Sequence, residues 1–175
     1  MRDIFYGVQN VLTNAGYKTK AKNVAVRLPY QSGFHIDVVP ARAQDETFYK
    51  ATVFKSEEGG TRQTSIKAHI DSVRDSGVRD VVKIMKLWRL RHELAWSSFA
   101  LEQTVCRALQ DKRTGDLGTD VWNVFIFIQG QIKSIVLKDP ANSNNVIEMD
   151  VLIRLQLLQK ATACLGMANW ATIVW

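Results

Sequence analysis

The hydrophobic periodicity of this chain changes once, at the polar stretch of residues 55–61, and that change restricts the folds open to it. Before this stretch, a helical pattern over residues 3–15 is followed by segments in which apolar and polar residues alternate, as in half-buried strands. After it, apolar residues recur at the spacing of amphipathic helices. We therefore predict an α+β fold, in which residues 1–60 form a sheet domain with an N-terminal helix and residues 61–175 form an α-helical bundle lobe.

The expected elements follow the same two patterns. Alternation bounded by turn residues predicts strands over residues 24–28, 34–40 and 48–54, the first two joined as a hairpin. Helical spacing predicts helices over residues 66–76, 78–93, 98–110, 121–129 and 148–165. Turn-forming residues predict loops over residues 112–118 and 139–145.

Composition excludes several classes of protein. With 46% hydrophobic residues among 175, the chain can bury a core and is not a disordered tail. Cys106 and Cys164 stand in apolar surroundings without metal-ligand spacing, which predicts buried thiols in a reducing compartment. No signal-peptide pattern and no membrane-spanning apolar run is present, so we expect a cytoplasmic protein without a membrane partner. A net charge of +6 fits a polyanionic partner such as nucleotide or RNA.

A single carboxylate interrupts the apolar strand of residues 34–40. Alternation places Phe34, Ile36 and Val38 on the face expected to join the core, and Asp37 on the other face. An ionised carboxylate among apolar residues is costly unless a metal ion or a hydrogen-bond donor pairs with it. Asp37 is therefore a candidate metal ligand, and the alternatives are pairing with Lys or Arg or a pKa raised by desolvation.

The predicted helix of residues 78–93 carries a row of cations. Its apolar residues share one face, and Arg79, Lys83 and Lys86 share the opposite one. In most proteins such a row is the solvated face of an amphipathic helix. The alternative is a row of donors aimed at phosphate groups.

Two serines precede the apolar run that begins at Phe99. Either Ser97 or Ser98 is expected to cap the helix that starts there. The same helix N-terminus offers free backbone N–H groups, so a serine at this place is also a plausible phosphate contact.

The three histidines are expected to be structural. His35, His69 and His92 have no Ser, Cys or carboxylate partner at a recognisable catalytic spacing. A catalytic triad is therefore not predicted.

Six short segments follow one another along nearly the whole chain in a specific order. They read FHIDVVP at residues 34–40, TSIKAH at 64–69, IMKLWR at 84–89, SFALE at 98–102, DPANSNNV at 139–146 and WATI at 170–173. The set resembles the nucleotidyltransferases of the DNA polymerase β-like superfamily. The likeness is to the branch of oligoadenylate synthetases, cyclic GMP-AMP synthases and bacterial CD-NTases, although Ile66 stands where that family has proline.

The resemblance implies a nucleotidyltransferase mixed β-sheet and a two-metal mechanism, in which three carboxylates hold two Mg²⁺ ions during transfer from ATP or GTP. The products in such families are linear or cyclic oligonucleotide second messengers, made in bacteria for anti-phage defence. By this resemblance Asp37 would be the third carboxylate, both catalytic and metal-binding. Lys86 and Ser98 would contact the donor triphosphate, with Lys83 of the same row as a further candidate.

One part of the family pattern is missing from the chain. The family places a Gly-Ser loop and an Asp-x-Asp or Glu-x-Asp pair before the strand matched here, and the chain begins too late to contain them. The segment Glu148-Met149-Asp150 has the right spacing, but it follows the Asn-rich loop and is expected to start a helix. With one carboxylate of three, Mg²⁺ binding by this chain alone should be very weak.

Three functions remain open. The chain could be the C-terminal part of a nucleotidyltransferase, inactive alone, whose first strands and missing carboxylates come from an upstream protein fragment. It could instead be a non-catalytic relative that binds nucleoside triphosphate or RNA, or docks a partner, through its basic helix. The third alternative is a generic α+β domain whose likeness to the family is accidental.

Overall fold

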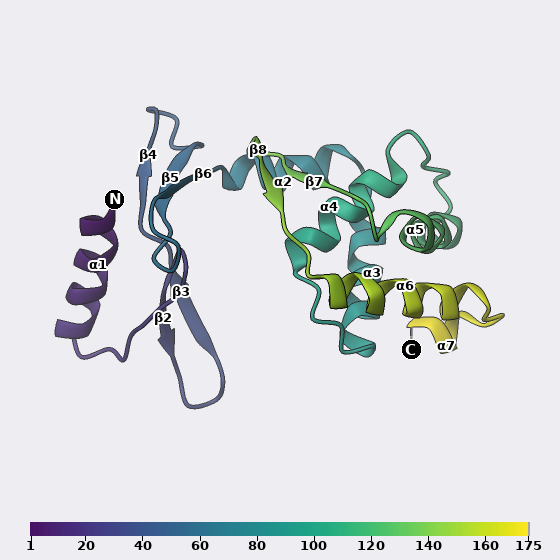
Figure 1. Ribbon diagram of the computed structural model, residues 1–175, viewed down its shortest axis with the longest axis horizontal. Helices are drawn as coiled ribbons and strands as arrows, with labels where there is room; N and C mark the ends of the chain where they lie inside the picture. Colours follow the sequence, from purple (N-terminus) through teal and green to yellow (C-terminus); the bar gives the residue numbers. More distant parts are fainter. Residues whose placement is uncertain (175) are drawn as a thin grey trace. The chain divides into compact units, whose positions relative to one another are not determined.

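The computed structural model describes the backbone of residues 1–174 and the side chains of residues 1–173, in two compact units, Met1–Ala68 and His69–Trp175 (Figure 1). The first unit combines a helix with short strands, and the second is mostly helical, so the predicted α+β class is confirmed. The expected boundary after residue 60 falls just before β6 (Thr61–Thr64), which pairs with β5 (Ala51–Phe54) and therefore belongs to the first unit.

The first unit begins with α1 (Arg2–Asn14) and continues with two three-stranded sheets. One sheet contains β1 (Lys20–Ala21), β2 (Val26–Pro29) and β3 (His35–Val38), and the other contains β4 (Ala41–Ala43), β5 and β6. Every described strand pair is antiparallel, whereas the family resemblance led us to expect a mixed sheet. The β2–β3 hairpin agrees with the predicted one, whereas β1 and β4 are too short for alternation to indicate them.

The core of the first unit joins α1 to the strands. Phe5 of α1 is fully buried against Val26 of β2 and Phe54 of β5. The rings of Phe5 and Phe54 meet edge to face, with their centroids 5.8 Å apart. Because β2 pairs with β3, this small cluster also positions the strand that carries Asp37.

The second unit contains most of the predicted helices. Most lie close to their expected bounds, but the helix predicted from residue 121 begins at Leu117, inside the predicted loop of residues 112–118. In chain order its elements are α2 (Ile66–Asp75), α3 (Arg79–Arg91), α4 (Ser98–Leu109), α5 (Leu117–Gln131), β7 (Leu137–Asp139), β8 (Asn142–Ile147), α6 (Val151–Leu165) and α7 (Trp170–Val174), the first turn of α2 being grouped with the first unit. Within residues 1–174, none of the helices combines the length and the apolar character that crossing a membrane requires.

The predicted loop of residues 139–145 is instead largely a hairpin. Leu137 of β7 lies opposite Ile147 of β8, and both side chains are buried. The turn is stabilised by Asp139, whose carboxylate accepts a hydrogen bond from the backbone N–H of Ala141 at 2.8 Å. Turn-forming side chains therefore stabilise the turn of this hairpin, and the buried pair of Leu137 and Ile147 holds its two strands together.

A continuous apolar core fills the second unit. Trp88 of α3 is fully buried at its centre, with its ring 5.2 Å from that of Phe125. The indole Nε1 of Trp88 donates a hydrogen bond to Sγ of Cys164 at 3.3 Å. Cys164 is buried and Cys106 is half-buried, and both are free thiols.

Replacing Trp88 by Ala should reduce the free energy of unfolding by about 3–5 kcal/mol, because a large buried ring leaves a cavity behind. Leu90→Ala on the same helix is the control, since Leu90 is 63% exposed and its loss should change stability by less than about 0.5 kcal/mol. Urea unfolding followed by circular dichroism measures both. Equal losses in the two variants would contradict the core described here.

Candidate functional site

Asp37 is paired with an arginine on the neighbouring strand. The β2–β3 register places Asp37 directly opposite Arg27. Nε of Arg27 donates to one carboxylate oxygen and Nη2 donates to the other, both at 2.8 Å. This two-pronged hydrogen bond holds the pKa of Asp37 below its ordinary value. Of the alternatives that the sequence left open, pairing with a basic side chain is the one observed, and the pKa is lowered, not raised.

The apolar face of β3 is less buried than its alternation suggested. Val38 is half-buried, but Ile36 is 42% exposed and Phe34, just before the strand, is 61% exposed. The expectation that these three residues form core is therefore wrong for Phe34 and Ile36. The sheet order places β3 at an edge of its sheet, which accounts for this exposure.

The carboxylates that the structure describes do not gather into a magnesium site. Among the described residues, no group of three or more His, Cys, Asp or Glu side chains could hold a metal ion. Both oxygens of Asp37 are already engaged by Arg27. Asp150 caps α6 by accepting a hydrogen bond from the N–H of Leu152 at 2.7 Å, as a helix start should. Asp37 alone therefore does not fit Mg²⁺, which needs several hard oxygen ligands.

Lys86 and Ser98, the predicted triphosphate contacts, lie on neighbouring helices of the second unit. Nζ of Lys86 on α3 forms an ion pair with Glu102 on α4. Ser98 lies one helical turn before Glu102 on α4. The structure thus brings Lys86 and Ser98 to the same side of the contact between α3 and α4.

Arg89 is the residue of this cluster that sequence reasoning missed. Its Nη1 donates to the carbonyl oxygen of Trp96 at 2.7 Å and to Oγ of Ser98 at 3.1 Å. Ser97, and not Ser98, is the helix cap, because its Oγ accepts from the N–H of Ala100 at 3.1 Å. The sequence did contain a signal for Arg89, because it follows Lys86 by about one helical turn and therefore lies on the same side of the helix.

Lys83 is placed differently from Lys86. It forms an ion pair with Asp80, one turn earlier on the same helix, at 2.9 Å. Its side chain is 67% exposed, compared with 37% for Lys86. The structure therefore does not bring Lys83 to α4, and the solvated-face interpretation describes it well.

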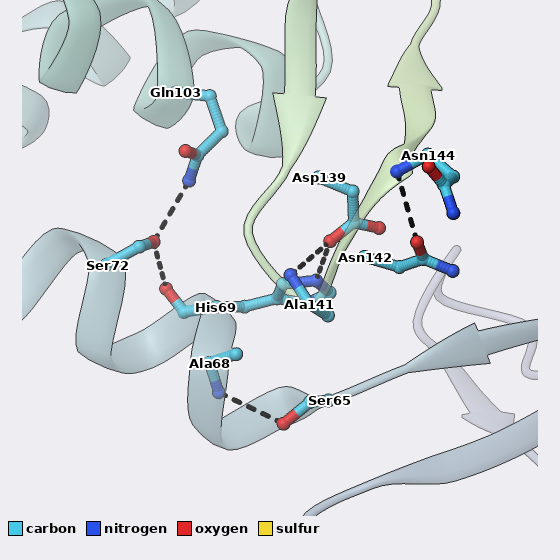
Figure 2. A network of polar contacts seen from close by, with 9 residues as sticks. All are labelled: Ser65, Ala68, His69, Ser72, Gln103, Asp139, Ala141, Asn142 and Asn144. Carbon is cyan, nitrogen blue, oxygen red and sulfur yellow. Dashed lines mark hydrogen bonds and ion pairs between the residues drawn. The ribbon is translucent and has the colours of Figure 1, made fainter.

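His69 has a carboxylate partner that its sequence neighbourhood does not reveal. Its Nε2 lies 2.8 Å from Oδ1 of Asp139, whose side chain is fully buried in the β7–β8 hairpin. Figure 2 draws this contact. The ring of His69 also lies 4.5 Å from that of Phe99. His92 is hydrogen-bonded through Nε2 to the carbonyl oxygen of Ile173 at 3.2 Å. These contacts join α2 to the hairpin and α3 to α7, which is a structural role for both histidines.

Comparison with known proteins identifies the class of fold. No family profile and no curated protein matches the chain by sequence. Among solved structures, the chain is similar to CdnC of E. coli MS115-1 with ATP, at a TM-score of 0.69 and 15% identity over 92% of this chain and 63% of that one. The chain therefore shares the fold of CdnC over most of its length.

Two further structures specify that class. CdnC in its complex with HORMA-deltaN has a TM-score of 0.67 at 15% identity, over 92% of this chain and 62% of that one. The CD-NTase CdnG of Bradyrhizobium diazoefficiens in complex with GTP has a TM-score of 0.67 at 12% identity, over 99% of this chain and 70% of that one. The chain thus has a CD-NTase-like fold and spans less than two thirds of the length of CdnC.

Replacing Arg27 by Gln should return the pKa of Asp37 toward its ordinary value of about 3.9, because the hydrogen bonds that favour the carboxylate are lost. In the native protein, the stabilisation from this pair is present above the ordinary pKa and is lost as the pH falls through the lowered one. The stability difference between native protein and variant should therefore shrink in acid. Carbon NMR titration of the Asp37 carboxyl group and pH-dependent unfolding measure these effects.

Arg42→Gln is the matched control, because Arg42 is an exposed arginine of β4 in the same unit. It should leave the pKa of Asp37 unchanged. An unchanged pKa in Arg27→Gln would show that the pair does not form in solution.

Proposed function

We propose that this chain binds the triphosphate of a nucleoside triphosphate through Lys86 and Ser98, with Arg89 as a third donor. The observation that carries this proposal is their grouping on α3 and α4 within a CD-NTase-like fold. CdnC and CdnG, which share this fold, are known in complexes with ATP and with GTP respectively. The lysine and the arginine at this contact can donate the charge-assisted hydrogen bonds that bind a triphosphate.

The contacts of these residues in the free protein support a site prepared for an anion. Glu102 holds the Lys86 ammonium group at α4, and Ser98 holds the Arg89 guanidinium group nearby. Both helices are anchored by the core, so little side-chain order would have to be acquired on binding. A phosphate group would take over Lys86 from Glu102, which makes Glu102 a competitor of the ligand.

We further propose that nucleotidyl transfer needs two carboxylates beyond Asp37. The described residues of this chain provide no metal-binding cluster, and Arg27 occupies both oxygens of Asp37. Magnesium would bind only in an assembly that adds the missing carboxylates and frees Asp37 from Arg27. In that assembly, synthesis of an oligonucleotide second messenger for anti-phage defence is the proposed activity.

The edge of β3 is the place where a completing fragment would dock. β3 pairs with β2 on one side and with no described strand on the other. Its neighbourhood exposes Phe34 and Ile36, which an added strand could cover. Asp37 lies on this same strand, so a fragment paired here could bring carboxylates close to it.

A non-catalytic role is the second proposal, and the Arg27–Asp37 pair favours it. An arginine that pairs with both carboxylate oxygens compensates the charge of Asp37, so this carboxylate needs no metal ion. In this role the chain would bind nucleoside triphosphate, or RNA, without metal.

Titration with ATP, with and without Mg²⁺, tests the binding site. Lys86→Ala should weaken ATP binding by at least about tenfold, because a charge-assisted contact is lost. Glu102→Gln should strengthen it by up to about fivefold, because the competing charge is removed. Calorimetry measures both.

Lys83→Ala is the matched control for this titration, since it removes the same charge from the same helix but from a side chain paired with Asp80. It should change the affinity by less than about twofold. Equal effects of Lys83→Ala and Lys86→Ala would contradict a defined site. A short RNA that binds while ATP does not would favour the RNA-binding role.

Pyrophosphate release from ATP and GTP separates the two proposals. The chain alone should release none, with or without Mg²⁺. Addition of a fragment that carries a Gly-Ser loop and an Asp-x-Asp pair should restore Mg²⁺-dependent release, and Asp37→Asn should abolish it. If the fragment binds and no pyrophosphate appears, the chain is non-catalytic.

A further inference from the structure

The second unit contains a pocket of about 740 Å³ at the other end of α4 from the proposed triphosphate site. It lies among the junction of α2 with α3, the last turn of α4 and the start of β7. Arg107, one of its lining residues, follows Ser98 by nine positions on α4, which is about 14 Å along a helix. The pocket is therefore separate from the Lys86 cluster, and nothing described above explains it.

The lining of this pocket carries more positive than negative charge. Arg107, Arg113 and Lys138 line it together with one carboxylate, that of Asp111. Nη1 of Arg107 donates to the neutral amide of Gln110 at 2.8 Å, so its charge is not compensated there. Among the residues that the structure describes, the side chain of Lys138 forms no hydrogen bond or ion pair. Two cations are thus available to an anionic ligand.

Among the residues that line the pocket, Arg113 has a different role from Arg107 and Lys138. Its Nη1 donates to the carbonyl oxygen of Gly77 at 2.6 Å, and its Nε lies 3.5 Å from the buried carboxylate of Asp120. These contacts fix the loop after α4 to the junction of α2 and α3. Arg113 therefore shapes the pocket, whereas Arg107 and Lys138 are left to bind.

The remaining surface suits a ring that can form hydrogen bonds. Val136 is 62% exposed and gives the pocket an accessible apolar surface, whereas Val78, Leu109 and Leu137 are at least 96% buried and belong to the core beside it. Gln103 and Gln110 also line the pocket and contribute polar amide side chains. Apolar walls combined with a few polar groups are typical of sites for small organic ligands, which usually have volumes of about 300–1,000 Å³.

We propose that this pocket binds a phosphorylated small molecule of mononucleotide size, with its phosphate between Arg107 and Lys138 and its ring against Val136. Arginine and lysine supply charge-assisted hydrogen bonds to the phosphate oxygens. The glutamine amides supply donors and acceptors to the ring edge. The site is independent of the triphosphate site, so AMP, which lacks the β- and γ-phosphates, is the probe for it.

Cys106 provides the readout, because it lines this pocket and the other cysteine, Cys164, is buried. Burial raises the pKa of the Cys106 thiol, so labelling is carried out in mildly alkaline solution, and all labelling rates are compared at one pH. Iodoacetamide is neutral, and charge substitutions therefore do not change its attraction to the pocket. Mass spectrometry of the full chain gives the rate at Cys106.

AMP at about ten times its Kd should slow the labelling of Cys106 about tenfold, because only about one pocket in ten stays free. The double variant Arg107→Gln, Lys138→Gln should raise the Kd at least about tenfold. Both side chains are exposed, so folding should be unaffected. Lys138→Gln alone serves as a second variant, because this side chain has no partner to lose.

Lys112→Gln is the matched control. Lys112 is exposed and adjacent in sequence to two lining residues, but it does not line the pocket. It should change the Kd by less than about twofold. Lys86→Ala should leave the protection by AMP intact, so this test is independent of the triphosphate proposal.

Three results would overturn the inference. The first is a labelling rate that AMP does not change. The second is protection that persists in the double variant and disappears in Lys86→Ala, which would assign the effect to the triphosphate site. The third is equal protection by inorganic phosphate and AMP at the same concentration, which would show that the ring contributes nothing.

Discussion

The burial of Trp88 and Met85 in the second unit determines which side chains α3 presents to its neighbours. Both are fully buried, and Val82 beside them is 4% exposed. At about 100° per residue, Lys86 lies about 100° and Lys83 about 160° away from the direction of Met85. Lys86 therefore stands at the edge of the buried face, where Glu102 of α4 can reach it, and Lys83 points to solvent. The candidate triphosphate site is thus a consequence of how the core orients this helix.

The Arg27–Asp37 pair has the same kind of origin in the first unit. Packing of Phe5 on Val26 fixes the face of β2 that is buried, and alternation then turns Arg27 to the opposite face. The hairpin register places Asp37 directly across from it. An arginine and an aspartate in directly opposed positions form a favourable cross-strand pair, so the carboxylate is stabilised without metal. The carboxylate that the sequence resemblance predicted as a metal ligand therefore has a structural partner in the folded chain.

Much of the fold could be predicted from the sequence, because helices such as α3 and α4 are long enough for their periodicity to be unmistakable. The β7–β8 hairpin could not, since its Asn-rich segment has the composition of a loop and only the pairing of Leu137 with Ile147 makes it a sheet. For the candidate site, Lys86 and Ser98 were predicted from motifs, and their contact with a triphosphate stays a prediction. Arg89 was missed because its hydrogen bond to Ser98 depends on the path of the chain between α3 and α4.

The sequence by itself determined the local features of this protein: the change from alternating to helical periodicity, the approximate positions of most helices, and the isolated carboxylate at Asp37. The tertiary structure alone decided which side chains pair with one another. Arg27 and Asp37 are 10 residues apart, Lys86 and Glu102 are 16 apart, and His69 and Asp139 are 70 apart. Periodicity reports which face of an element is buried, whereas a contact between elements depends on how those faces pack together. The chemistry of Asp37 and Lys86 was therefore visible in the sequence, and what each of them binds in the folded chain was not.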